Sequence, residues 1–165
     1  MQFACIWINK LNMKITLCGS MAFHAEMEKI GEQLHKDGHE VRVPLLRIEA
    51  EESGRDRKMS IRALIAQGGG VDAFPQDHPV WKEKSDAIDD HFAKVTWSDA
   101  ILVVNYPKHE IDGYVGGNTL MEMAVAHYLK KKIYVLLPIS HKISYKEEIL
   151  GMHPTIIDEN LSLIA

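Results

Sequence analysis

Disulfide frameworks, membrane spans and nucleic-acid surfaces each need a sequence feature that this chain lacks. It has only two cysteines, Cys5 and Cys18, too few for a disulfide framework or a four-cysteine metal site. No apolar run reaches the roughly 18 residues of a membrane-spanning helix, and no run of Lys and Arg forms a basic stripe. We therefore expect neither a membrane nor a nucleic acid as a partner, and a reduced, cytoplasmic setting.

The chain also lacks internal repeats and low-complexity segments, and we expect no secretory leader in it. Its apolar segment at residues 3–8 is too short for the core of a signal peptide, and no cleavage signature follows. The first strand-like segment begins near Met13, so residues 1–12 are predicted to be an N-terminal extension. The length of 165 residues suggests that residues 13–165 form one domain.

Apolar, strand-like segments alternate with segments of helical periodicity. Met27, Ile30 and Leu34 recur at helical spacing, for example, until Asp37-Gly38 ends the pattern. Strands are predicted at residues 14–18, 40–43, 100–105, 132–137 and 155–157, helices at 22–36, 84–97, from the glycine loop to about 130, and at 145–150, and a last turn at 160–164. This alternation predicts an α/β domain with a parallel sheet covered on both faces.

Residues 49–80 interrupt the alternation and form a long insert. The segment 49–58 is dense in charge, residues 61–65 indicate a short helix, and Gly68-Gly69-Gly70 should end it. Pro75 and Pro79 favour irregular chain up to the next helix at about Lys84. Inserts of this length act as lids, are disordered or contact partners, and the sequence leaves these alternatives open.

The loop after the first strand is one candidate binding element, because parallel sheets bind ligands beyond the carboxyl ends of their strands. Gly19, Ser20, Met21 and Phe23 lie where the strand passes into a helix, so backbone N–H groups can meet an anion or a sugar hydroxyl. The loop has neither the Walker pattern nor G-x-G-x-x-G. A tight turn capped by Ser20 would explain the same residues.

A second candidate is the stretch GYVGGNTLMEMAVAH, at residues 113–127. Gly116 and Gly117 allow close backbone approach to a ligand, and Asn118 and Thr119 offer hydrogen-bonding groups. Glu122 has two competing interpretations. It completes the capping-box pattern Thr119-x-x-Glu122, or it is a reacting carboxylate whose pKa the helix N-terminus lowers, as a glycosidic nucleophile needs.

The helix before the third strand contributes a histidine. With about 100° per residue and Ile88–Val95 taken as the buried face, His91 stays near that face. Asp89 falls on the flank, and Asp90 points toward water. His91 is therefore the residue expected to face the crevice, where it could donate a proton; a hydrogen-bonded core histidine is the alternative.

Four segments in order resemble the nucleoside 2-deoxyribosyltransferase superfamily, which includes the 2′-deoxynucleoside 5′-phosphate N-hydrolases. They read MKITLCGS, GHEVRVP, HFAKVTWSDAILVV and DGYVGGNTLMEMAVAHYLKKKIYVLL. The resemblance covers Met13 to about Leu137. It implies a flavodoxin-like or Rossmann-like doubly wound sheet of about five strands, and a homodimer or higher homo-oligomer.

The resemblance also implies an activity and assigns residues to it. Glu122 stands where the family has its nucleophile, which attacks the anomeric carbon of a nucleoside or nucleotide and forms a covalent glycosyl-enzyme. His91, or Asp89, would assist departure of the base. Gly19, Ser20, Asn118 and Thr119 would bind sugar or phosphate, and Asp112 would hold a hydroxyl or serve as a turn residue. No metal or redox cofactor is expected.

The sequence departs from the family pattern at several positions. His91 stands where many members have an aspartate, Asn118 replaces a glycine, and Met21-Ala22 follow Ser20 where phosphate-binding members have an arginine. A phosphate could still be held by Ser20, main-chain N–H groups, or Arg57, Lys58 or Arg62.

Three other functions remain as alternatives. The same crevice could sense a nucleotide without turning it over. A phospho-receiver domain has a similar fold, although the third strand ends at Asn105 rather than at an aspartate. The insert could also recruit a partner to an interaction domain.

Overall fold

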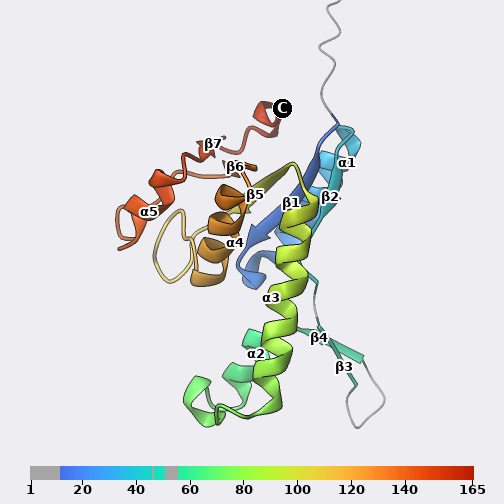
Figure 1. The fold of residues 1–165 in the computed structure, drawn as a ribbon, viewed down its shortest axis with the longest axis vertical. Coiled ribbons are helices and arrows are strands. Elements are labelled where there is room, and N and C mark those ends of the chain that lie inside the picture. Colours follow the sequence, from blue (N-terminus) through green and yellow to red (C-terminus); the bar gives the residue numbers. More distant parts are fainter. Residues whose placement is uncertain (1–11, 46, 51–55) are drawn as a thin grey trace, which may run out of the picture.

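The computed structural model describes residues 12–45, 47–50 and 56–165, with backbone alone for residues 47–50 and 56–59. Figure 1 shows a central parallel sheet with helices on both faces. Five strands make up this sheet in the order β2-β1-β5-β6-β7. Their bounds are β1 Lys14–Gly19, β2 Glu40–Arg42, β5 Ala100–Val104, β6 Lys132–Val135 and β7 Thr155–Ile156. The predicted flavodoxin-like, doubly wound α/β fold is confirmed.

Strand β5, in the middle of the sheet, is apolar along its whole length because both faces of the sheet are covered. All five residues of β5, AILVV, are buried. Alternate side chains point to opposite faces, so Leu102 belongs to one core cluster and Ile101 and Val103 to the other. Two hydrophobic layers therefore hold the sheet between them.

Each face of the sheet has its own helices. Helix α1 (His24–Lys36) packs with Met27 and Leu34 into the first cluster, to which Ile164, after the short helix η3 (Leu161–Leu163), also belongs. Helices α3 (Pro79–Trp97), α4 (Gly117–Tyr128) and α5 (Lys146–Gly151) cover the opposite face.

Helix α3 begins at Pro79, one turn or more before the predicted start near Lys84. Proline at the first helical position is favourable, because its missing N–H would have no helical partner and its φ angle is already helical. His78 caps the helix by accepting a hydrogen bond from the backbone N–H of Val80 at Nδ1 (3.2 Å). Pro79 was thus wrongly taken as a sign of irregular chain.

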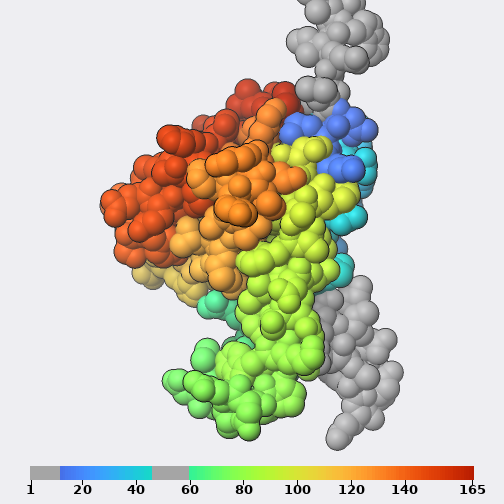
Figure 2. All heavy atoms as spheres, in the orientation of Figure 1, coloured from blue at the N-terminus to red at the C-terminus, as the bar shows by residue number. Residues whose placement is uncertain are grey.

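The insert contains regular structure. Strands β3 (Arg47–Ala50) and β4 (Asp56–Met59) pair antiparallel, and α2 (Ile61–Gln67) and the short helix η2 (Val71–Ala73) follow. In Figures 1 and 2, α2 and η2 extend beyond the sheet along the first half of α3. Phe74 contacts both His78 and Trp81 edge-to-face, which ties the end of the insert to α3.

The predicted N-terminal extension lies almost wholly outside the described chain, since residues 1–11 are not described. Among the helices that are described, none combines the length and the apolar character needed to cross a bilayer.

Candidate functional site

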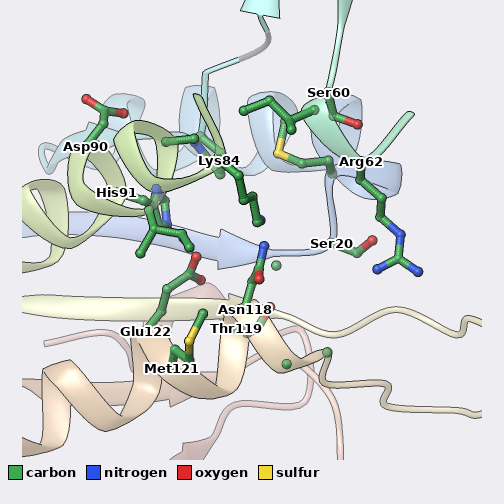
Figure 3. A pocket seen from close by; sticks show the side chains of 18 of the residues that line it. Ser20, Ser60, Arg62, Lys84, Asp90, His91, Asn118, Thr119, Met121 and Glu122 are labelled. Carbon is green, nitrogen blue, oxygen red and sulfur yellow. Dashed lines mark ion pairs between the residues drawn. The ribbon is translucent and has the colours of Figure 1, made fainter. Parts of the chain in front are cut away.

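A cavity of about 780 Å³ opens at the carboxyl ends of β1 and β5. The sequence order of the strands reverses between these neighbours, and open α/β sheets bind ligands at such a point. The walls come from the loop after β1, the start of α4, the inner face of α3 and the beginning of α2 (Figure 3). Six segments remote in sequence therefore supply it, including Pro44-Leu45 after β2 and Lys108 in the loop after β5.

Glu122 does not cap its helix. Gly116 is the N-cap of α4 and Gly117 is its first residue, so Glu122 lies in the second turn and no acidic residue lies in the first. Thr119 is buried inside the helix rather than at its cap position. The capping-box interpretation is therefore wrong, and the side chain of Glu122 is available to the cavity.

The Glu122 carboxyl is also not the low-pKa group that the sequence suggested. Only 9% of the residue is exposed. Burial raises its pKa from 4.5 to about 8, because a charged carboxylate loses its hydration there; the nearby Cys18 thiol and the Lys84 charge oppose this rise only in part. Position in the second turn removes it from the strongest influence of the helix dipole. With this pKa, Glu122 is mostly protonated at neutral pH.

His91 faces Glu122 from the neighbouring helix α3 (Figure 3). Its Nε2 atom lies 3.4 Å from Oε1 of Glu122, and it is 7% exposed. Burial and the charge of Lys94 lower the pKa of His91 to about 4, against a smaller opposing effect of Asp90. At neutral pH the pair therefore consists of a neutral imidazole and a carboxylic acid, which together hold one transferable proton.

The Cys18 thiol completes this buried group at the end of β1. It is fully buried, and its sulfur lies within 4.8 Å of ligand atoms of both His91 and Glu122. Burial, followed by the proximity of Glu122, raises the pKa of the thiol well above its usual value. No spacing in the sequence indicated that this thiol lies against Glu122.

A second part of the cavity is cationic. Lys108 donates a hydrogen bond from Nζ to Oγ of Ser20 over 2.6 Å, and Arg62 and Lys84 line the same cavity. Burial lowers the pKa of Lys108 and of Lys84. Glu122 opposes this effect at Lys84, and the nearby charge of Arg62 lowers the pKa of both lysines further. Three cationic side chains thus act on one cavity. An anionic ligand would relieve their mutual repulsion.

The cavity brings most of the predicted site residues together. Those that line it are Gly19, Ser20, Met21, His91, Gly116, Gly117, Asn118, Thr119 and Glu122. Three predicted residues do not line it. Phe23 packs against the core and Tyr106, Asp112 is exposed in the loop after β5, and Asp89 is exposed on α3.

Asp90, rather than Asp89, lines the cavity. The helical-wheel argument placed Asp90 toward water, and its side chain is indeed half exposed while it pairs with Lys94 Nζ at 2.8 Å. In Figure 3 its carboxylate points away from Glu122. Neither aspartate therefore faces Glu122, whereas His91 does.

Glycine stands at two positions of the site for different structural reasons. A Cβ at Gly19 would lie 2.7 Å from the carbonyl oxygen of Val104, so close strand packing alone requires glycine there. A Cβ at Gly117 would meet nothing within 4 Å. Gly117 therefore leaves open space beside the cavity, as close approach of a ligand to the backbone would need.

Sequence reasoning missed several lining residues. Lys84 precedes His91 by two helical turns, so their shared face could have been found from the spacing. Lys108 and Tyr114 lie in the long loop after β5, where no pattern distinguishes them. Of the phosphate candidates, Arg62 reaches the cavity, whereas the side chains of Arg57 and Lys58 lie outside those described.

Asn105 has a structural role, which argues against a phospho-receiver domain with its phosphate acceptor at this position. It is buried at the end of β5. Its Nδ2 donates to the carbonyl oxygen of Leu137, and its Oδ1 accepts from the Leu137 N–H, both at 2.8 Å. This side chain joins two strand ends and does not face the cavity as a phosphate acceptor would.

Comparison with known proteins adds no relative: no protein-family model matches the chain, and neither the curated proteins nor the solved structures give a match.

Proposed function

We propose that the protein cleaves or transfers the N-glycosidic bond of a nucleoside or nucleoside monophosphate, through a covalent glycosyl intermediate on Glu122. The observation that carries this proposal is the buried carboxyl of Glu122 facing His91 at 3.4 Å inside a large cavity. A nucleophile and a proton donor side by side are what displacement at an anomeric carbon requires. The resemblance to the deoxyribosyltransferase superfamily supports the same assignment.

The cavity suits a ligand with one anionic end. Its volume, about 780 Å³, lies within the ~300–1,000 Å³ typical of small-molecule sites. Ser20, Lys108 and Arg62 would hold a 5′-phosphate or a sugar hydroxyl by charge-assisted hydrogen bonds. The anomeric carbon would then lie over Glu122, with the base toward His91 and α3. This polarity favours a nucleoside monophosphate over a nucleoside.

The proton that Glu122 carries accounts for the first step. Glu122 passes its proton to His91, and the resulting carboxylate attacks C1′. The bond between C1′ and the base nitrogen breaks, and its electron pair goes to the base. His91 gives the proton to that nitrogen, so the base leaves neutral. The number of protons in the site balances without a metal or a redox group.

The second step decides between hydrolysis and transfer. A water molecule that attacks C1′ loses a proton to His91, and the C1′–Glu122 ester bond breaks to release the sugar. A second base that attacks through its nitrogen gives a new nucleoside instead. Departure of the first base opens the space beside His91 that either acceptor would occupy.

The experiment that tests this proposal is intact-protein mass spectrometry after incubation with a pool of nucleosides and nucleoside monophosphates, alongside chromatography of released base. The wild type should gain the mass of a sugar or sugar phosphate and release one base. Glu122→Gln should do neither, whereas Glu147→Gln on the exposed face of α5 should behave as the wild type. Base release that persists in Glu122→Gln would refute the role of Glu122.

A second function, a nucleotide sensor that does not turn its ligand over, is favoured by one observation. The raised pKa of Glu122, about 8, keeps it protonated and non-nucleophilic at neutral pH. A sensor predicts that wild type and Glu122→Gln bind the same nucleotide with equal affinity and that neither forms an adduct. Calorimetric titration of both proteins with members of the pool distinguishes a sensor from an enzyme.

A homodimer or higher homo-oligomer belongs to the same proposal, together with a cytoplasmic location. Leu45 and Met121 line the cavity and yet are 71% and 40% exposed. A neighbouring subunit that covered these apolar side chains would also narrow the mouth of the cavity. Sedimentation equilibrium of the wild type and of Met121→Lys would test this, since a charge there should weaken association.

A further inference from the structure

Three possible metal ligands meet at the buried side of the cavity. They are Sγ of Cys18, Nε2 of His91 and a carboxylate oxygen of Glu122, all within 4.8 Å of one another. They come from β1, α3 and α4, so the tertiary fold alone brings them together. Sequence spacing gave no sign of this set.

Two of these groups have unused hydrogen-bonding capacity. Within the described part of the chain, Nε2 of His91 and Oε2 of Glu122 are buried polar atoms without a hydrogen-bond partner. The side chain of His91 is 8% exposed and that of Glu122 is 11% exposed. Buried polar atoms normally have partners, so both atoms have capacity to bind a ligand.

The spacing of the donor atoms agrees with a zinc ion. Zinc binds histidine nitrogen and carboxylate oxygen at about 2.0–2.2 Å in tetrahedral geometry, which separates two such ligands by about 3.3–3.5 Å. The observed distance from Nε2 of His91 to Oε1 of Glu122 is 3.4 Å. One ion between them would satisfy the histidine nitrogen without any change in this separation.

The chemistry of the donors selects the metal. A thiolate and an imidazole favour Zn²⁺ over Mg²⁺ or Ca²⁺, which take oxygen ligands. Thiolate and carboxylate together carry two negative charges, so a bound Zn²⁺ makes the buried centre neutral and avoids the cost of an unpaired charge. The fourth tetrahedral position would face the cavity and take a water or a ligand.

We propose that Cys18, His91 and Glu122 form a zinc-binding site at the base of the cavity. Bound zinc occupies the carboxylate that the proposed glycosidic reaction needs. Zinc is therefore an inhibitor of that reaction, and substrate and metal compete for the site. The inhibitory part of the inference rests on the proposed function, whereas zinc binding itself does not.

The direct test uses tag-free, chelator-treated protein titrated with Co²⁺ and then Zn²⁺. Cobalt should produce a thiolate-to-metal charge-transfer band in the near ultraviolet together with tetrahedral bands in the visible, and one equivalent of zinc should abolish them. Competition with a chromophoric chelator should give one zinc per chain. Absence of the charge-transfer band, or no zinc retained against the chelator, would overturn the proposal even without any variant.

Matched variants assign the ligands. Cys18→Ser and His91→Gln should each weaken zinc binding by more than the roughly 10- to 100-fold that loss of an outer-shell partner costs. His127→Ala removes an exposed histidine at the end of α4 and should leave the affinity unchanged. Equal affinity in all four proteins would overturn the assignment; circular dichroism melting checks that each variant is folded.

The two proposals can fail separately. Zinc binding without any glycosidic activity would leave the metal site standing and remove the proposed function. Activity that is unaffected by zinc at saturating occupancy would remove the inhibitory inference and keep the function. Activity that zinc suppresses in the wild type, with restoration by chelator, is the result expected if both hold.

Discussion

Nε2 of His91 and Oε1 of Glu122 lie 3.4 Å apart across the interface of α3 and α4, and both side chains are buried. Burial acts on them in opposite directions: it raises the pKa of the acid and lowers the pKa of the base. The pair is therefore neutral at neutral pH, with the proton on Glu122. The proposed reaction takes its proton from this pair.

Glu122→Gln should stabilise the protein in a pH-dependent way. The carboxyl ionises near 4.5 in the unfolded chain and near 8 in the folded one, so the wild type loses stability as pH rises between these values. Glutamine cannot ionise. The stability advantage of Glu122→Gln should be small near pH 4.5 and largest near pH 8, reaching several kcal/mol at most, because one pKa unit corresponds to about 1.4 kcal/mol.

Urea unfolding of both proteins from pH 4.5 to 8.5, with a chelator present, measures this difference. His91 adds a separate dependence: its folded pKa of about 4 lies below its usual 6.5, so stability falls as pH drops between these values. Both proteins retain His91, so the difference curve isolates Glu122 to a first approximation. If the free energies of unfolding of the two proteins changed with pH in parallel throughout the range, Glu122 would not be a buried carboxyl with a raised pKa.

His91→Gln should lose most activity on substrates whose leaving base must be protonated before it departs. Removal of a general acid costs about 10²- to 10⁴-fold in rate. An N7-methylated purine leaves without protonation, so His91→Gln should retain far more of the wild-type kcat on that substrate than on the unmethylated one. The measurement is kcat for both substrates; an equal loss on both would make His91 a positioning residue instead.

Lys108→Met and Arg62→Gln should weaken recognition of a 5′-phosphate. Charge-assisted hydrogen bonds contribute about 1.5–3 kcal/mol, so KM for a nucleoside monophosphate should rise roughly 10- to 100-fold, while KM for the matching nucleoside changes little. Lys29→Met, on the exposed side of α1, is the charge control and should affect neither substrate. A rise in KM for both substrates alike would place the phosphate elsewhere.

Gly113→Ala and Gly117→Ala should have opposite effects on stability. Gly113 has φ of 59°, and a Cβ there would lie 1.9 Å from the carbonyl oxygen of Pro138. Its replacement should therefore cost several kcal/mol, in keeping with strain added to a steric clash. Gly117 opens α4 with free space around its Cβ position, so alanine should be neutral or stabilising by up to about 1 kcal/mol.

Thermal melting of both glycine variants measures the stability difference. Gly117→Ala offers a second readout, because its methyl group would enter the cavity wall. If a ligand approaches the backbone there, KM should rise although the fold is unharmed. An unchanged KM would show that Gly117 serves only the start of the helix.

Local sequence patterns determined much of the architecture. Apolar runs predicted the central strands β1, β5 and β6, because a strand covered on both faces needs few polar side chains. The edge strands β2 and β7 are short and keep exposed residues. Helical periodicity placed His91 toward the core, and the glycine stretch before Glu122 marked the start of α4. The start of α3 was missed because Pro79 reads equally as a helix breaker and as a first helical residue.

Only the tertiary structure decided the chemistry of the site. Thr119-x-x-Glu122 matches a capping box in sequence, but the backbone begins its helix at Gly117, which moves Glu122 to the second turn. The raised pKa of that carboxyl follows from burial, a property of packing that no local pattern contains. Likewise Cys18, His91 and Glu122 converge from three elements, and Lys108 meets Ser20 across the cavity. Sequence periodicity records which face of an element is buried, whereas distance and desolvation between remote residues exist only once those faces have packed together.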